Sequence, residues 1–236
     1  MTQSTYLPGL AVRHLPKHRA LANFKLIAFD MDSTLINIEC IDEIAAVAGK
    51  KAEVAAITEA AMRGEITDFR DSLTRRLQLL RGVPVRALQT VYDEKLELNP
   101  GAETLVEACQ QAGLKVLLVS GGFTFFADRV RQRLGLDFAR SNRLEIADGA
   151  LTGRVEMQSW GDICDGAEKR RTVLELASLM GIATDQIIAV GDGANDLPMM
   201  HASGLSVAYR AKPKVRDGAM VAINEGGLDR LLEVVR

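Results

Sequence analysis

The stretch Lys25-Leu26-Ile27-Ala28-Phe29-Asp30-Met31-Asp32-Ser33-Thr34-Leu35 joins a short apolar run to two closely spaced carboxylates. The apolar half is typical of a buried strand in a sheet that is covered on both faces. At the end of such a strand, Asp30 and Asp32 lie close together, and their charges repel unless a cation or a proton intervenes. A divalent metal resolves this repulsion. The alternative is an acidic loop whose Ser33 and Thr34 hydroxyls bond backbone N–H groups.

Length and composition indicate a globular chain for which neither nucleic acid nor a membrane is the expected main partner. The 236 residues suit one large domain or one domain with an insertion. The hydrophobic share of 47% is ordinary, and a net charge of −2 argues against nucleic acid or a membrane as the main partner. The sequence contains neither an apolar run of about 18 residues nor a signal-peptide core. We therefore predict a cytoplasmic protein.

The cysteines and histidines indicate neither a disulfide framework nor a zinc site. The 3 cysteines are odd in number, far apart and without a CxxC pattern, and the 3 histidines form no HExxH pattern. We interpret all of them as structural or surface residues. They are Cys40, Cys109, Cys164, His14, His18 and His201.

The N-terminal part of the chain divides into an arm, the first strand and a helical stretch. Residues 1–22 show no sustained period and predict an extended arm or a short helical turn. From residue 39 to about 97 the pattern is helical, with Gly49, Gly64, Gly82 and Pro84 between the segments. The predicted helices are 43–48, 52–62, 68–80 and 85–96.

Beyond residue 97 the chain alternates between predicted strands and helices. Asp148-Gly149, between alternating apolar residues, indicates a hairpin over 143–156. The alternation predicts a doubly wound, Rossmann-like parallel α/β sheet into which the helical stretch is inserted. The predicted elements are helices 102–111 and 168–180, strands 114–119, 187–190, 205–208 and 220–223, and a terminal helix from residue 228.

Polar, glycine-rich sequences follow the predicted strands at three places. These are Asp30 to Thr34, Ser120-Gly121-Gly122 and Gly191-Asp192-Gly193-Ala194-Asn195-Asp196. In a parallel sheet the carboxyl ends of strands meet at one edge, where ligands bind. Glycines of this kind mostly form turns, so each motif alone is weak, but their combination indicates one shared site.

Together these sequences resemble the first, second and fourth motifs of the haloacid dehalogenase superfamily of aspartate-nucleophile phosphohydrolases. The resemblance implies a catalytic core formed by residues 23–38 and 98–236. It also implies a helical cap over residues 39–97 that selects the substrate, preceded by the N-terminal arm 1–22.

The resemblance assigns catalytic roles to the carboxylates. Asp30 is the expected nucleophile, and Asp32 the general acid and base. One Mg²⁺ per site is expected on the Asp30 carboxylate, the Asp32 main-chain carbonyl and Asp192, since octahedral Mg²⁺ is commonly held by few protein oxygens together with phosphate and water. Asp196 is expected to support the site, and whether it contacts the metal stays open.

The phosphate group needs donors of its own. Ser120 and the N–H of Gly121 are expected to bind it at the start of a helix, although Ser120 could instead serve as a helix cap. The third motif of the superfamily is a single lysine, for which Lys169 fits best. Arg170 and Arg171 are the alternatives, as is a solvated charge at a helix start.

The insertion carries a narrower resemblance. Met62-Arg63-Gly64-Glu65, Phe69 and the segment 72–77 are similar to the branch of the superfamily that hydrolyses O-phospho-L-serine to L-serine and phosphate, the last step of L-serine biosynthesis. This likeness implies that Glu39 binds the ammonium and Arg76 the carboxylate. Met62 and Phe69 would close over the carbon skeleton.

Three further points belong to this narrower resemblance. Asn195 is also expected to bind substrate. One additional residue lies between Met62 and Ser72, so Arg75 is an alternative to Arg76; on a helix the two point roughly 100° apart. A small-molecule substrate is the expected partner, and the chain is expected to be a monomer or a homodimer.

Two other functions compete with this interpretation. A related phosphatase or phosphotransferase that acts on another phosphorylated amino acid or amino alcohol would share the core. A phospho-accepting receiver module also uses a doubly wound sheet with an aspartate and a lysine. That module accounts neither for Asp32 nor for the helical insertion.

Overall fold

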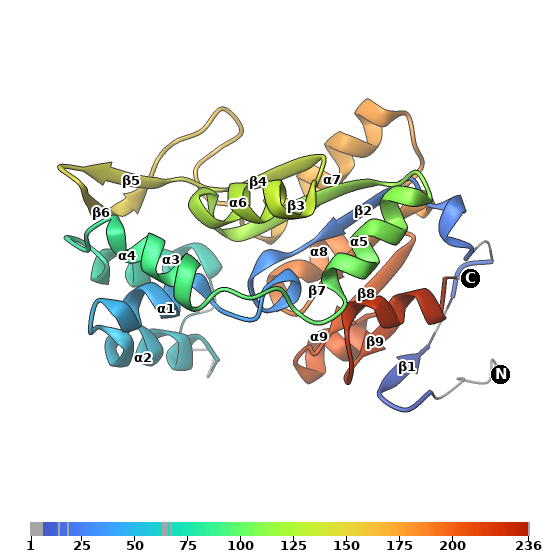
Figure 1. Cartoon of the computed structure of the whole chain (residues 1–236), viewed down its shortest axis with the longest axis horizontal. Helices are drawn as coiled ribbons and strands as arrows, with labels where there is room; N and C mark the ends of the chain where they lie inside the picture. The colour runs from blue at the N-terminus through green and yellow to red at the C-terminus, as the bar shows by residue number, and fades with distance from the viewer. Residues whose placement is uncertain (1–6, 14, 18, 63–65, 67, 236) are drawn as a thin grey trace.

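The computed structural model describes residues 7–13, 15–17, 19–62, 66 and 68–235. Within these residues a seven-stranded sheet forms the centre of the molecule (Figure 1). Its strands are β1 (Leu10–Val12), β2 (Leu26–Phe29), β3 (Lys115–Phe123), β4 (Phe138–Asn142), β7 (Ile187–Gly191), β8 (Leu205–Tyr209) and β9 (Val221–Ile223). They lie in the order β1-β9-β8-β7-β2-β3-β4, and all neighbours are parallel except β1 and β9.

Helices cover both faces of this sheet. Alternate residues of the buried strands pack into two separate apolar clusters, because successive side chains of a strand point to opposite faces. Ile27 packs on the face with α5, α6 and η5, and Ala28 on the face with α7, α8 and α9. These elements are α5 (Ala102–Gln111), α6 (Thr124–Leu134), α7 (Gly166–Met180), α8 (Leu197–His201), α9 (Pro213–Gly218) and η5 (Leu228–Glu233). The predicted doubly wound fold is confirmed.

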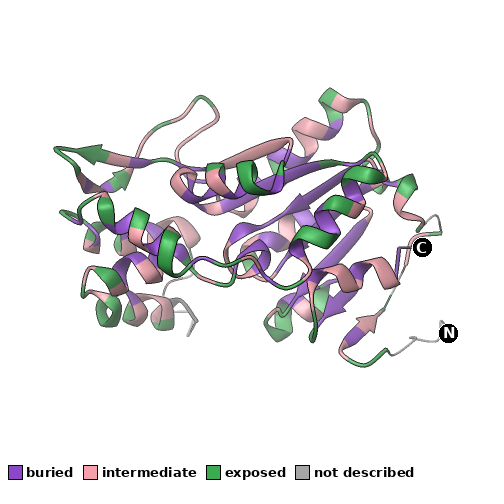
Figure 2. Cartoon of the chain, viewed as in Figure 1, coloured by how far each residue is buried: buried purple, intermediate pink, exposed green. Residues whose placement is uncertain are grey.

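The helical insertion is a bundle beside the sheet (Figure 1). It follows a kinked turn, η2 (Met31–Leu35), and leads back to α5. Its helices are α1 (Cys40–Val47), α2 (Lys51–Met62), α3 (Phe69–Leu79) and α4 (Arg86–Glu94). The helices turn buried faces toward one another (Figure 2). Three of them bury apolar stripes, as Ile44, Leu77 and Val91 illustrate, and α2 contributes Val54.

The predicted hairpin is also present, as β5 (Leu144–Ala147) and β6 (Ala150–Val155). Asp148 and Gly149 both have positive φ, the backbone conformation that a tight hairpin turn requires. The hairpin pairs with the loop between α3 and α4: Gly82 N–H donates to Leu151 O at 2.8 Å, and Leu151 N–H donates to Val83 O at 2.8 Å. The insertion is thus joined to the hairpin by backbone hydrogen bonds.

Several elements differ from the sequence prediction. Part of the predicted arm is β1, which completes the sheet by pairing antiparallel with β9. β4, α8 and α9 were not predicted, because they are short and carry no apolar period. The terminal helix predicted from residue 228 is present as the 3₁₀ helix η5. No helix of the described residues is long and apolar enough to cross a membrane.

Candidate active site

The three predicted motifs meet at one edge of the sheet. β2 lies between β3 and β7, and Phe29 at its end pairs with Leu118 of β3 and Val190 of β7. Asp30, Ser120 and Asp192 each follow one of these paired residues by one or two positions. They therefore lie side by side at the same edge of the sheet. The site lies at the carboxyl ends of parallel strands, where the sheet topology favours ligand binding.

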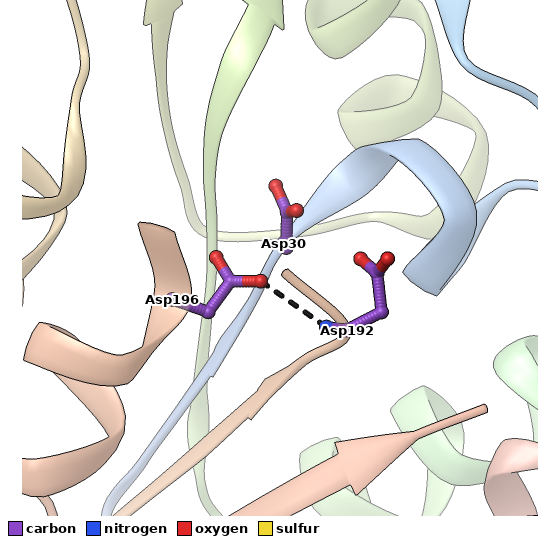
Figure 3. Close-up of side chains that lie close together, drawn as sticks. All are labelled: Asp30, Asp192 and Asp196. Carbon is purple, nitrogen blue, oxygen red and sulfur yellow. Dashed lines mark hydrogen bonds between the residues drawn. The ribbon is translucent and has the colours of Figure 1, made fainter. Parts of the chain in front are cut away.

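Three carboxylates gather at this edge. Asp30 is 5% exposed and Asp196 is fully buried, and one oxygen from each of Asp30, Asp192 and Asp196 lies within 4.8 Å of the others (Figure 3). Like charges at this separation are unfavourable in a buried site. The cluster therefore favours bound cations or protons.

Lys169 supplies one of these cations. It lies in the first turn of α7, is fully buried, and its Nζ is 2.7 Å from Asp30 Oδ1 and 2.6 Å from Asp196 Oδ1. Burial alone would lower the pKa of this ammonium, but Asp196 and Asp30 raise it above its ordinary value. Lys169 is therefore charged and joins the first motif to the fourth, whereas Arg170 is exposed.

Asp196 has both oxygens engaged. Its Oδ1 binds Lys169, and its Oδ2 accepts the N–H of Asp192 at 3.1 Å (Figure 3). The same Oδ2 accepts the N–H of Gly193 at 2.9 Å. The carboxylate lies so close to Gly191 that a Cβ there would be 2.4 Å from Asp196 Oδ2. Asp196 therefore shapes the loop that carries Asp192, and glycine is needed at position 191.

Burial and repulsion change the protonation of the remaining carboxylates. Burial, with the Asp196 charge next, raises the pKa of Asp30 to about 7, although Lys169 and the N–H of Met31 oppose the shift. Burial and then Asp30, Asp196 and Glu39 raise the pKa of Asp192 to about 8. Both groups are thus poised to exchange protons for a metal cation.

Asp32 projects beside the second motif. A Cβ on Gly122 would lie 3.0 Å from its Oδ2, so the absence of a side chain there makes room for the carboxyl group. Burial, followed by the charges of Glu39 and Asp30, holds the pKa of Asp32 well above its ordinary value. No hydrogen bond of normal geometry reaches its buried Oδ1 from the described residues. Such a group is suited to giving and taking a proton.

The turn after Asp32 directs Glu39 toward the site. Ser33 has φ 56°, and in this left-handed conformation its hydroxyl donates to Glu39 Oε1 at 2.7 Å. The Glu39 side chain is exposed by area, yet surrounding protein atoms enclose it enough that burial raises its pKa. Glu39, which directly precedes α1, therefore lies near enough to Asp32 and Arg76 for its charge to act on both.

The second motif forms the end of β3 rather than a loop before a helix. β3 continues to Phe123 and α6 begins at Thr124, so Ser120 does not cap that helix. Its buried hydroxyl instead accepts the N–H of Gly122 at 2.8 Å. The motif is bent, as the register shift against β4 indicates.

The insertion reaches the site through α3. A Cβ on Gly121 would lie 2.7 Å from Phe69 Cζ, which shows that the Phe69 ring packs on the second motif. Arg76 is half-buried, and burial lowers its pKa while Asp42, Glu39 and Asp32 oppose the shift. Arg75 is exposed and pairs with Asp71 of its own helix at 2.8 Å.

Met62 and Asn195 are the two other residues predicted to bind the substrate. Met62 ends α2, and its side chain lies outside the described residues, as do Arg63, Gly64 and Glu65. Asn195 is half-buried, and its Oδ1 would lie 2.4 Å from a Cβ on Gly193. It therefore folds back over the fourth motif.

Two contributors were not predicted in their observed roles. Thr34 donates its hydroxyl to Asp192 Oδ1 at 3.1 Å, instead of bonding a backbone N–H group. Asn142 at the end of β4 donates to Gly121 O at 2.7 Å and accepts from Cys164 N–H at 2.7 Å. Neither residue has a sequence signal for this, because both contacts depend on the strand order.

The residues present fit a hard divalent cation. Oxygen ligands, buried like charges and raised carboxyl pKa values are the features that Mg²⁺ binding would exploit and relieve. Asp30 and Asp192 offer carboxylate oxygens within the cluster. Asp196 fits a supporting role better, because both of its oxygens already accept hydrogen bonds.

A doubly wound sheet with this acidic, lysine-bridged edge defines a hydrolase of the haloacid dehalogenase type. The family model described as haloacid dehalogenase-like hydrolase matches residues 27–201, and the chain belongs to this family.

Relatives narrow the assignment within the family. The chain is 66% identical over 229 residues to the phosphoserine phosphatase of Polaromonas sp., covering 97% of both chains. It is 62% identical to that of Albidiferax ferrireducens, covering 99% of both. A solved structure described as a phospho-aspartyl intermediate analogue of phosphoserine phosphatase matches with a TM-score of 0.83 and 38% identity, covering 90% of this chain and 99% of that one. Within its family, the chain groups with the phosphoserine phosphatases.

Proposed function

We propose that the chain is a Mg²⁺-dependent phosphatase that hydrolyses O-phospho-L-serine to L-serine and phosphate. The observation that carries the proposal is the position of Asp30, held 2.7 Å from the buried Lys169 and facing an insertion that presents Glu39 and Arg76. This arrangement offers a nucleophile, a charge for the phosphate and two opposite charges for an amino acid.

The reaction proceeds in two displacements on phosphorus. In the first, an Asp30 carboxylate oxygen forms a bond to phosphorus while the ester P–O bond breaks, and Asp32 gives its proton to the serine alkoxide. In the second, water attacks the aspartyl-phosphate, Asp32 takes a proton from it, and the bond to Asp30 breaks to release phosphate. Acid–base help of this kind is worth about 10²–10⁴ in rate.

The phosphate oxygens are bound by Lys169, the Ser120 hydroxyl and the N–H of Gly121. The Lys169 ammonium is fixed by two carboxylates, so little reorganisation is needed when charge moves to the phosphate. Phe69 packs on Gly121 and would exclude water from this side.

The metal ligands are the Asp30 carboxylate, the Asp32 main-chain carbonyl and Asp192. When bound, one Mg²⁺ supplies positive charge that favours ionised Asp30 and neutralises the phosphate. The Asp196 carboxylate positions Asp192 by accepting the backbone N–H of Asp192, and the Thr34 hydroxyl orients the Asp192 carboxylate.

Specificity comes from the helical insertion, residues 39–97, which acts as a cap over the site. Glu39 binds the ammonium and Arg76 the carboxylate, while Phe69, Met62 and Asn195 contact the rest of the substrate. The observation that favours Arg76 over Arg75 is that Arg76 is half-buried near Glu39, whereas Arg75 pairs with Asp71 on the outside. The proposed core comprises residues 23–38 and 98–236.

This reaction would complete L-serine biosynthesis in the cytoplasm. The test is phosphate release from O-phospho-L-serine compared with sugar phosphates and amino-alcohol phosphates, with Mg²⁺ and with chelator. Selective, metal-dependent release from phosphoserine is the expected result. Preference for another phosphorylated amino acid or amino alcohol would keep the Asp30 chemistry and contradict the roles of Glu39 and Arg76.

A further inference from the structure

Arg70 crosses from the helical insertion to the core. It is the second residue of α3, and its guanidinium forms an ion pair with Asp162 and another with Asp165, in which Nη1 lies 3.1 Å from Oδ2. Nη1 also lies 3.5 Å from the carbonyl oxygen of Ile163. Between described residues, the ion pairs of Arg70 with Asp162 and Asp165 are the ones that connect α1–α4 with the core.

The residue next to Arg70 enters the site. Phe69, the first residue of α3, packs on Gly121 of the phosphate-binding motif. Adjacent residues of one helix turn cannot move independently, so the position of Arg70 fixes how close the Phe69 ring comes to Gly121.

The acidic partners of Arg70 are anchored in the same site. Asp165 caps α7, since its Oδ1 accepts Glu168 N–H at 2.9 Å, and Lys169 N–H donates to Asp165 O at 2.9 Å. Cys164 N–H donates to Asn142, whose amide donates to Gly121 O. Contacts thus run from Arg70 through residues 162–165 and Asn142 to Gly121 and return through Phe69.

The Arg70 ion pairs are partly exposed and therefore weak. The Arg70 side chain and that of Asp162 are each 40% exposed, so water screens the pair, which changes an equilibrium by only about 1.5- to 5-fold. Beyond the other end of α3, uncharged backbone hydrogen bonds join the α3–α4 loop to the hairpin β5–β6. The charged contact at α3 is therefore the one that salt can weaken.

We propose that Arg70 is a positioning residue, whose ion pairs with Asp162 and Asp165 hold the start of α3, and with it Phe69, against Gly121 over the bound phosphate ester. This inference rests on the proposed phosphatase function. In this role Arg70 does not bind the substrate itself; it sets how close the start of α3 lies to Gly121.

The test compares matched arginines of one helix. Arg70→Ala removes both ion pairs, and Arg75→Ala, the control, removes an exposed ion pair within α3. Asp162→Asn deletes the partner's charge but keeps an acceptor for Ile163 N–H, which donates to Asp162 Oδ1 at 2.8 Å. The readouts are kcat/KM for O-phospho-L-serine at low and high salt, and amide hydrogen exchange of residues 69–73 and 162–165 without substrate.

We expect Arg70→Ala to lower kcat/KM by about 2- to 10-fold at low salt and to speed exchange in both segments, whereas Arg75→Ala changes neither. High salt should reduce the difference between wild type and Arg70→Ala. The Arg70→Ala, Asp162→Asn double variant should be no worse than Arg70→Ala alone, and Arg70→Lys should restore part of the activity.

Equal effects of Arg70→Ala and Arg75→Ala, or additive effects in the double variant, would overturn the proposal. Faster exchange without any change in kcat/KM would do the same. Failure of the wild type to hydrolyse phosphoserine would contradict the proposed function instead. Hydrogen exchange needs no substrate, so it still tests the Arg70 contact if the wild type is inactive. Faster exchange in Arg70→Ala would then support the role of Arg70 in holding α3, and unchanged exchange would contradict it.

Discussion

Lys169 Nζ lies 2.7 Å from Asp30 Oδ1, and both side chains are shielded from solvent. This ion pair connects α7 with the residue that follows β2, and the two residues are 139 positions apart in the chain (169 − 30). It keeps a cation beside the proposed nucleophile before any substrate arrives. The first prediction follows from this contact.

Lys169→Met should destabilise the metal-free protein strongly. The substitution leaves Asp30 and Asp196 buried without their shared cation, which costs about 3–5 kcal/mol when a fully buried pair loses one partner. Urea unfolding in chelator measures the loss. Arg170→Met, one position along at an exposed site, is the control and should change little. A similar, small loss in both variants would contradict the buried role of Lys169.

Arg76→Ala should weaken binding of phosphoserine selectively. Losing a charge-assisted hydrogen bond to the carboxylate should raise KM by about 10- to 100-fold. O-phosphoethanolamine lacks the carboxylate, so its KM should change much less. Arg75→Ala serves as the control on the same helix. Equal changes for both substrates, or a larger effect from Arg75→Ala, would exclude Arg76 from the proposed role.

Glu39→Gln should show the opposite preference. An amide no longer pairs with the ammonium, so KM for phosphoserine should rise by about 10-fold or more. O-phospholactate keeps the carboxylate but has no ammonium, and its KM should stay nearly constant. If the substitution impaired both substrates alike, Glu39 would act on the site as a whole and not on the ammonium.

The metal-free protein should lose stability as the pH rises from about 4 to about 8. Asp30 and Asp192 have pKa values of about 7 and about 8 against ordinary values of 3.8, so the folded state binds more protons in this range. The stability contribution is complete below the ordinary pKa and is lost as the pH passes through the raised values. Each 1 kcal/mol or so lost lowers Tm by roughly 2–4 °C for a chain of this size.

Thermal unfolding in chelator at pH 5 and pH 8 measures this effect. Added Mg²⁺ should raise Tm more at pH 8, where it does not compete with protons, and Asp192→Asn should flatten the pH dependence. A Tm in chelator that is higher at pH 8 than at pH 5 would contradict the raised pKa values.

The sequence predicted the site where local patterns mark strand ends. Apolar runs followed by carboxylates and glycines identified β2, β3 and β7, and parallel strand geometry then brought Asp30, Ser120 and Asp192 together. The helix period of α3 also favours Arg76 over Arg75 as the inward-facing arginine. Ser72, Leu73 and Leu77 are buried, and Arg76 lies on their side of the helix.

Contacts between elements could not be predicted in this way. Asn142 reaches Gly121 only because β4 pairs with β3, and the five-residue β4 has no apolar alternation to mark it. The Arg70 ion pairs depend on how the insertion packs against residues 162–165, which no local pattern encodes. Lys169 was one of several basic candidates until the structure placed it in the buried cluster.

The most direct test of the mechanism is to find where the phosphoryl group is bound during turnover. Wild-type protein is mixed with O-phospho-L-serine and Mg²⁺, quenched in acid and digested, and the peptide that contains Asp30 is analysed by mass spectrometry. We predict a phosphoryl adduct on Asp30 in the wild type, and neither adduct nor phosphate release with a folded Asp30→Asn variant. Undiminished phosphate release by Asp30→Asn, or an adduct on another residue, would contradict nucleophilic catalysis by Asp30.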